Sequence, residues 1–98
     1  MTINKTKNGT ELLLALEGRL DTLTAPDLEK ELKTSLDEVT SLTLDLDKLE
    51  YISSAGLRVL LSAQKTMSMQ GEMKVCHVNE TVMEIFEVTG FSDILNIA

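Results

Sequence analysis

The sequence predicts an α/β fold, a single domain over residues 1–98 in which helices cover mainly one face of a mixed β-sheet. Strand-like and helix-like segments alternate in the order β-β-α-β-α-β-α-β, which is typical of parallel strands joined by right-handed crossovers. An Asn-Gly pair near the N-terminus adds an antiparallel opening hairpin. Leucine alternates with polar residues over residues 41–47, so only one face of that strand is expected to be buried.

A β-hairpin is expected at the start of the chain. The turn at Asn8–Thr10 separates a polar segment, residues 2–7, from an apolar segment that begins at Glu11. The second strand is therefore expected to be the more buried of the two. We expect it to end at Gly18 and to be followed by a loop over residues 19–24.

An amphipathic helix and a strand follow this loop. Thr24 is a suitable N-cap, and leucine recurs at every fourth position after it among charged side chains. Val39 is expected to close the apolar end of the helix. The expected core positions of the helix and the strand are Leu28, Leu32, Leu36, Leu42, Leu44 and Leu46.

The apolar spacing changes from that of a strand to that of a helix after Ser53. This predicts a second helix that ends near Gly71, followed by a strand over residues 72–78. Asn79 is expected to cap a third helix, which Gly90 ends. The chain then finishes in a short last strand or an extended tail.

Composition and charge exclude several classes of partner. The formal net charge is -7, so nucleic acid and anionic membrane would repel the protein. The N-terminus is polar, and no apolar stretch is long enough to cross a bilayer. The single cysteine cannot form an internal disulfide, which fits a reducing compartment. We therefore expect a cytoplasmic protein that binds neither nucleic acid nor membrane.

No catalytic, metal or cofactor site is expected, and the protein is not predicted to be an enzyme. The sequence contains no Gly-rich phosphate loop. Cys76 and His77 are neighbours in a predicted strand, so their side chains should point to opposite faces, and neither has a partner at metal-ligand spacing. Four carboxylates could gather at one end of the sheet, but we interpret them as solvated loop residues: Asp21, Asp45, Asp47 and Glu50.

Two adjacent serines, Ser53 and Ser54, stand at the junction between a strand and a helix. One interpretation is capping, in which a hydroxyl accepts a backbone hydrogen bond worth about 1 kcal/mol. The other is phosphorylation, because a helix start can hold a phosphate that adds about -1.5 to -2 charges. Such a charge would block a partner and spare the fold. Ala55 and Gly56 either leave the first turn bare for a partner or serve close packing inside the domain.

Three stretches of the sequence resemble the STAS domain, the fold of bacterial anti-sigma factor antagonists. The resemblance implies a mixed sheet with helices mainly on one side. The three stretches appear in the family's order and cover nearly the whole chain, which makes the match specific. They are EGRLDTLTAPDLEKEL, LTLDLDKLEYISSAGLRVLL and GEMKVCHVNETVMEIFEVTGFSDIL.

The resemblance implies a phosphorylation switch. In the family, the unmodified protein binds a partner that is both a serine kinase and an anti-sigma factor, and so frees the sigma factor. Phosphorylation of a serine two places before the junction glycine ends this binding, and a serine phosphatase resets it. That position is Ser54 here, with Ser53 as the alternative. The residues predicted to bind the partner are Asp21, Thr22, Ser53, Ser54, Ala55, Gly56 and Arg58.

This sequence departs from the family pattern at two positions of the junction. The family often has aspartate just before the phosphorylated serine, where this chain has Ser53, and serine just before the glycine, where it has Ala55. An alternative function is a STAS scaffold that is not phosphorylated, as a subunit of a signalling or transport assembly. A nucleotide-binding domain or small enzyme is disfavoured, because the phosphate loop is missing. The sequence leaves the oligomeric state open.

Overall fold

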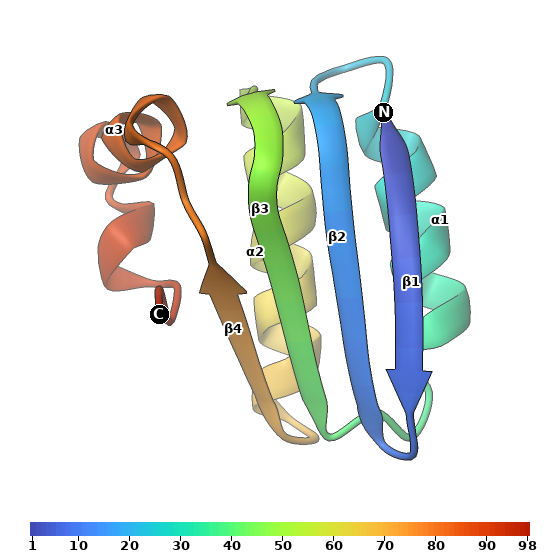
Figure 1. Cartoon of the computed structure of the whole chain (residues 1–98). Helices are drawn as coiled ribbons and strands as arrows, with labels where there is room; N and C mark the ends of the chain where they lie inside the picture. The colour runs from blue at the N-terminus through green and yellow to red at the C-terminus, as the bar shows by residue number, and fades with distance from the viewer.

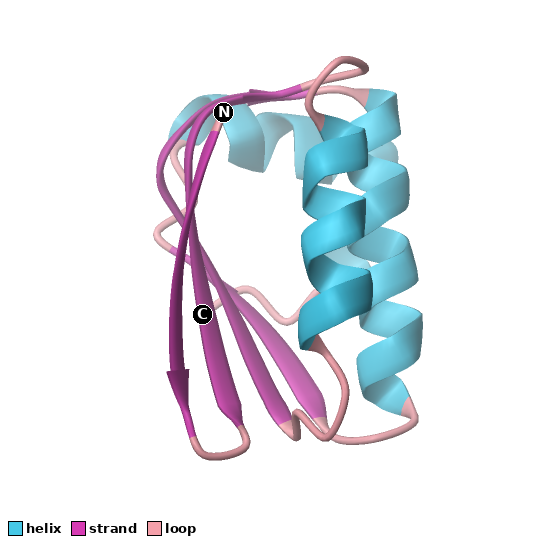
Figure 2. Cartoon of the chain, turned by 90° about the vertical axis from the view of Figure 1, so that its right-hand side faces the viewer, coloured by secondary structure: helices cyan, strands magenta, loops and turns pink.

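A four-stranded sheet in the order β1-β2-β3-β4 forms the body of the computed structural model, which covers residues 1–98 (Figure 1). β1 and β2 are antiparallel, whereas β2, β3 and β4 are parallel. Helices α1 and α2 lie side by side on one face of the sheet, and the other face is left open (Figure 2). The elements are β1 (Thr2–Asn8), β2 (Glu11–Leu20), α1 (Ala25–Ser35), β3 (Ser41–Ile52), α2 (Ser54–Ser68), β4 (Glu72–Cys76), α3 (Glu80–Thr89) and a 3-10 turn, η1 (Phe91–Asp93).

The predicted hairpin is confirmed, but its second strand is longer than expected. Gly9 forms the turn with φ of +63°, and β2 is the more buried strand. The prediction that Gly18 ends this strand is wrong, because β2 continues to Leu20. Gly18 has φ of +99° and lies where the pairing with β3 shifts register. A left-handed residue inside a strand produces a bulge, so here the glycine bends the strand without ending it.

One apolar core lies between the sheet and its helices, as the alternation of residues 41–47 predicts. Leu42, Leu44 and Leu46 are fully buried, whereas Thr43 and Asp45 point to the open face and are partly exposed. Each fully buried leucine contributes about 1.5–3 kcal/mol through removal from water. The buried core positions contributed by α1 and by the turn after it are Leu28, Leu32, Leu36 and Val39.

β3 is also longer than its alternating segment. The interpretation of Asp45, Asp47 and Glu50 as loop residues is wrong, because all three lie within β3. The strand continues past the alternating leucines to Ile52 because Leu49 and Ile52 are again buried against the helices. The extra length carries the strand-to-helix junction to the far end of the sheet.

The ends of the remaining helices follow the predicted signals. The backbone of Gly71 packs so closely on Thr40 that an added Cβ would lie 1.9 Å from the Thr40 carbonyl oxygen, so the turn after α2 requires glycine. The Asn79 side chain caps α3 by accepting from the Val82 N–H. Gly90 ends α3 in the left-handed conformation with φ of +81°. No helix of the structure has the length and apolar character needed to cross a membrane.

The end of the chain differs from the predicted last strand. Residues Phe91–Asp93 form a 3-10 turn, and Ile97 makes only an isolated parallel bridge with Val75. The Val75 N–H donates to the Asn96 carbonyl at 2.9 Å, and the Ala98 N–H donates to the Val75 carbonyl at 2.8 Å. The segment left after the 3-10 turn is too short to form a ladder, so the extended-tail alternative describes it better.

Candidate functional site

The two predicted partner-binding segments lie together at one edge of the sheet. Because β2 and β3 are parallel, their carboxyl ends meet at the same edge, where Leu20 is paired with Ile52 (Figure 1). The Ser53 N–H donates to the Leu20 carbonyl at 2.9 Å. The loop after β2 and the start of α2 are therefore joined by a backbone hydrogen bond.

Ser53 and Ser54 have different roles in the structure. Ser53 is the N-cap of α2, in an extended conformation, and its Oγ accepts from the Gly56 N–H at 3.4 Å. Ser54 is the first residue of the helix and is exposed, whereas Ser53 is half-buried. The capping interpretation is therefore confirmed for Ser53, and the Ser54 hydroxyl lies at the helix start in contact with solvent.

Gly56 serves packing inside the domain. It is buried, and a Cβ at this position would lie 2.7 Å from Leu20 Cγ, 2.8 Å from Ile52 Cγ1 and 3.0 Å from the Leu20 carbonyl oxygen. The absence of a side chain thus lets the first turn of α2 pack directly against the ends of β2 and β3. Of the two explanations for this glycine, close packing inside the domain is the one that the geometry favours. Gly56 itself offers little surface to a partner.

Asp21 organises the loop after β2. Its Oδ1 accepts from the N–H groups of Leu23 at 3.0 Å and Thr24 at 3.2 Å. Desolvation raises the pKa of the Asp21 carboxyl, but the hydrogen bonds from Thr24 and Leu23 and the charge of Arg19 together outweigh it and lower the pKa below its ordinary value. The carboxylate is thus already engaged within its own loop.

Thr24 occupies the predicted N-cap position of α1, but its side chain makes no cap hydrogen bond. Its Oγ1 donates to the Arg19 carbonyl at 2.7 Å and accepts from the Asp21 N–H at 2.9 Å. The hydroxyl therefore closes the loop over residues 19–24. The capping function that was predicted for Thr24 is taken over by Asp21, whose carbonyl also accepts from the Ala25 N–H at 2.8 Å.

The exposed part of this edge is mixed in character. Arg19 lies over the Tyr51 ring, 4.6 Å from its centroid, and its Nε is 3.8 Å from Asp21 Oδ2. Thr22 and Arg58 are exposed, as their predicted role requires. Leu23 is 86% exposed, and it is not among the individual residues that were predicted to bind the partner. The sequence could have indicated this residue, because it is an apolar side chain between two threonines in a polar loop and is not one of the expected core positions.

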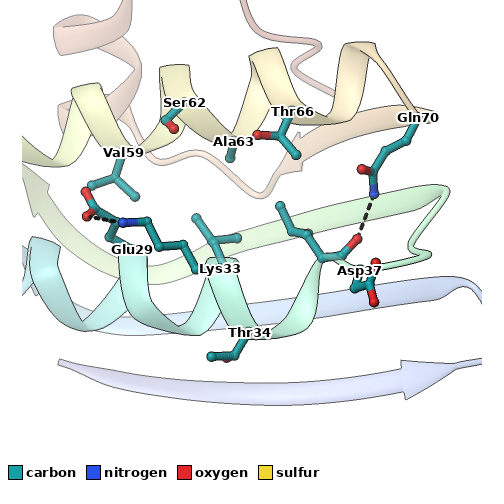
Figure 3. A pocket seen from close by; sticks show the side chains of 11 residues that line it. Glu29, Lys33, Thr34, Asp37, Val59, Ser62, Ala63, Thr66 and Gln70 are labelled. Atoms are coloured by element: carbon teal, nitrogen blue, oxygen red, sulfur yellow. Dashed lines mark hydrogen bonds and ion pairs between the residues drawn. The ribbon is translucent and has the colours of Figure 1, made fainter.

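The largest groove of the protein lies elsewhere. It has a volume of about 580 Å³ and is lined by α1 and α2 (Figure 3). Glu29 and Lys33 pair across one turn of α1 at 3.2 Å. Gln70 Nε2 donates to the carbonyls of Leu36 at 2.7 Å and Val39 at 2.6 Å. The polar groups of this groove thus hold the two helices and their connections together.

Cys76 and His77 do not lie as the sequence predicted. β4 ends at Cys76, and His77 follows it with φ of +56°, so the alternation of faces no longer applies between them. The sequence spacing shows no metal-ligand partner for either residue, but the fold brings a distant residue close to one of them, because His77 Nδ1 lies 3.0 Å from Asp45 Oδ1. The hydrogen bond with Asp45 and the negative charges of Asp45 and Asp47 raise the pKa of His77, against a smaller opposing effect of desolvation.

Comparison with known proteins gives a consistent family. Residues 2–98 match the family model described as the STAS domain. The chain is 42% identical over 89 residues to BtrV of Bordetella bronchiseptica, provisionally named an anti-sigma factor antagonist, a match that covers 89% of this chain and 77% of that protein.

Solved structures share the fold. An anti-sigma factor antagonist from Mycobacterium paratuberculosis superposes with a TM-score of 0.87 at 21% identity, over 98% of this chain and 83% of that one. The phosphorylated form of the Bacillus cell fate determinant SpoIIAA gives a TM-score of 0.76 at 16% identity, over 99% of this chain and 91% of that one.

Proposed function

The chain belongs to the STAS domain family, and on this premise we propose that it is a cytoplasmic anti-sigma factor antagonist that Ser54 phosphorylation switches off. The unphosphorylated form binds a serine-kinase anti-sigma factor, which then releases its sigma factor. Phosphorylation ends the binding, and a serine phosphatase restores it. The observation that carries this proposal is the exposed Ser54 hydroxyl at the start of α2, beside a loop held in place by its own hydrogen bonds.

The surroundings support Ser54 over Ser53 as the phosphorylated residue. Ser53 Oγ is engaged as the helix cap, so its modification would disturb the start of α2. Ser54 is the first residue of a helical turn that contains no acidic residue. A phosphate there would lie near free backbone N–H groups and the positive end of the helix dipole, which favours an anion by about 0.3–1 kcal/mol. The fold therefore tolerates the charge.

Arg58 supplies a reason why the charge would end binding. Ser54 and Arg58 are four residues apart on α2, and both are exposed, so they lie on the same side of the helix. In the unmodified protein Arg58 is available to an acidic group of the partner. A phosphate on Ser54 would pair with Arg58 and would also repel that acidic group. One modification thus removes an attraction and adds a repulsion.

Leu23 is the second proposed contact. It projects from the loop that Asp21 stabilises, next to the exposed Thr22. A large apolar side chain surrounded by polar groups is well suited to fill a pocket of a partner. The proposed docking surface therefore combines an apolar anchor, Leu23, with a polar switch, Ser54.

Phosphate transfer tests the site. The cognate kinase and ATP are incubated with wild-type protein, Ser54→Ala and the matched control Ser53→Ala. We expect uptake of one phosphate by the wild type and by Ser53→Ala, and none by Ser54→Ala. Phosphate uptake by Ser54→Ala would refute the assignment. If the wild type binds the kinase and takes up no phosphate, the alternative of a non-phosphorylated scaffold subunit is correct.

Binding tests the switch separately. Affinity for the kinase is measured by calorimetry for the wild type, Ser54→Asp and the nearly isosteric control Ser54→Asn. We expect Ser54→Asp to weaken binding at least about tenfold, or about 1.4 kcal/mol, and Ser54→Asn to change it much less. Equal affinities for the two variants would contradict a switch based on charge.

A further inference from the structure

A second group of reactive side chains lies on the open face of the sheet. Asp45 of β3 and Cys76 of β4 are paired in register on neighbouring parallel strands. Asp45 stands between the buried Leu44 and Leu46, so it points away from the helices, and Cys76 shares this face. His77 follows Cys76 directly, and its left-handed backbone brings the imidazole to the same place.

The three side chains form a compact triangle of donor atoms. One carboxylate oxygen of Asp45, Cys76 Sγ and one ring nitrogen of His77 all lie within 4.8 Å of one another. Both hydrogen bonds of the Asp45 side chain, from the Asp47 N–H and with His77 Nδ1, use Oδ1. Asp45 Oδ2 therefore remains free to donate an electron pair to a metal. In a tetrahedral metal site the ligand atoms are about 3.3–3.6 Å apart, so the three donor atoms would have to move closer together when a metal binds.

We propose that Asp45, Cys76 and His77 bind a zinc-class divalent transition metal, with water at the fourth position. Thiolate, imidazole and carboxylate together are the donors that Zn²⁺ takes in proteins, whereas Mg²⁺ and Ca²⁺ prefer oxygen alone. An ion pair between Asp45 and His77 would account for two members of the triangle. The metal accounts for all three, including the thiol.

The backbone of His77 is the second observation that favours a site. A non-glycine residue with φ of +56° adopts a conformation that L-residues avoid, and such strain gathers at functional positions. With this backbone conformation, the imidazole lies against Asp45 and not on the opposite face of the sheet. The site also stands apart from the proposed docking surface, because β3 separates Asp45 from Ser53 by about 25 Å of strand.

Cobalt titration of untagged protein tests the site directly. The chain has one cysteine and one histidine, so no other thiolate or imidazole can contribute. Co²⁺ bound to a thiolate gives a near-ultraviolet charge-transfer band that Co²⁺ bound to oxygen and nitrogen alone does not give. We expect this band to saturate at one equivalent with micromolar affinity, and Zn²⁺ to displace it.

Variants at the three ligands and one matched control decide the outcome. We expect Cys76→Ser to abolish the band, and Asp45→Asn and His77→Gln each to weaken binding at least about tenfold. Glu72→Gln removes a carboxylate at the other end of β4 and should leave binding unchanged. No saturation below about 1 mM Co²⁺, or wild-type affinity in all three ligand variants, would overturn the proposal.

A thermal shift gives a readout that is independent of the thiolate band. At a Zn²⁺ concentration about 100 times the dissociation constant, we expect the Tm of the wild type and of Glu72→Gln to rise by about 10–20 °C. The metal-free ligand variants should melt cooperatively, because the three side chains lie on the open face, and should show a smaller rise. A rise in Cys76→Ser and His77→Gln as large as in the wild type would place the metal elsewhere and overturn the proposal.

Discussion

The starts of α2 and α3 are built on the same plan and held in different ways. Ser53 and Asn79 are both extended N-cap residues that accept from the N–H three positions on. Asn79 Oδ1 accepts from the Val82 N–H at 2.9 Å, and its Nδ2 also donates to the Leu49 carbonyl at 2.6 Å. The Ser53 cap is a single hydrogen bond of 3.4 Å. The Asn79 side chain connects the start of α3 to the sheet by a hydrogen bond, whereas the start of α2 is held against the sheet by the close backbone packing of Gly56.

The first helical residue shows the same contrast. It is Glu80 in α3 and Ser54 in α2, and both are exposed. α3 therefore carries a permanent negative charge at its positive end, and α2 carries none. The start of α2 therefore lacks the negative charge that α3 has, and phosphorylation of Ser54, as proposed above, would supply one.

The largest effect is expected where α2 depends on packing. Gly56→Ala would insert a methyl group among Leu20 and Ile52, at the distances given above, and should destabilise the protein by about 1–3 kcal/mol in urea denaturation. Helix propensity alone predicts that Gly56→Ala raises the free energy of unfolding by up to about 1 kcal/mol. The sign of the measured change therefore distinguishes overpacking from helix propensity. Ser54→Ala, in the same turn but exposed, should change stability by less than about 0.5 kcal/mol and serves as the control.

The two caps give the next largest effect. Asn79→Ala loses the cap and leaves the Leu49 carbonyl without its side-chain donor, so we expect a loss of about 2 kcal/mol. Ser53→Ala loses one long hydrogen bond and should cost about 0.5–1 kcal/mol. The denaturant midpoints of both variants are compared with that of the wild type, provided that the m-values are equal. They check whether Asn79→Ala loses more stability than Ser53→Ala. Equal losses of stability in the two variants would show that the two caps contribute equally, contrary to this expectation.

Local signals explain which features could be predicted from sequence. The cap at Asn79, the turn at Gly9 and the left-handed end at Gly90 depend on residues within a few positions, and all are confirmed. The alternation of leucines in β3 likewise predicted which face is covered. For the candidate site, the exposed Ser54 at a helix start was anticipated from the same kind of signal.

Features that depend on distant neighbours could not be predicted. Gly18 reads as a strand end, and only pairing with β3 turns it into a bulge. The role of Gly56 requires knowledge that Leu20 and Ile52 lie beneath it. The proximity of His77 to Asp45 requires the register of β3 with β4 and one left-handed residue. The exposure of Leu23 could be suspected but not established without the loop geometry.

Charge at the first helical position should have a smaller effect of opposite sign in the two helices. Ser54→Glu places a carboxylate at the empty start of α2 and should raise stability by about 0.3–1 kcal/mol, whereas Glu80→Gln removes one from α3 and should lower it by a similar amount. Thermal denaturation at low and at about 1 M salt measures both, and salt should reduce both effects. The neutral control is Ser54→Gln, and a gain equal to that of Ser54→Glu would rule out a charge effect.

The start of α1 differs from the other two helix starts because an ionisable side chain, Asp21, holds it. Folding lowers the pKa of Asp21, so its ionised form stabilises the fold above its unfolded pKa of about 3.9, and this stabilisation is lost as the pH falls through the lower folded value. We expect Asp21→Asn to melt at a lower temperature than the wild type at neutral pH, and the gap to close below about pH 4. Ser53→Ala and Asn79→Ala remove caps that do not ionise. The difference in Tm between each of these variants and the wild type should therefore not decrease because of protonation of the cap. A constant gap for Asp21→Asn would contradict the role assigned to its charge.

The close packing of Gly56 against Leu20 and Ile52 also limits conformational change at the start of α2. Because the backbone of α2 packs directly on the core at Gly56, we expect the helix neither to slide nor to tilt when a group is attached to its first residue. We therefore expect the backbone of the domain to stay unchanged while the charge on one surface residue changes. Under the proposed switch, the partner would therefore have to contact residue 54 directly, and its dissociation rate would set the speed of the response.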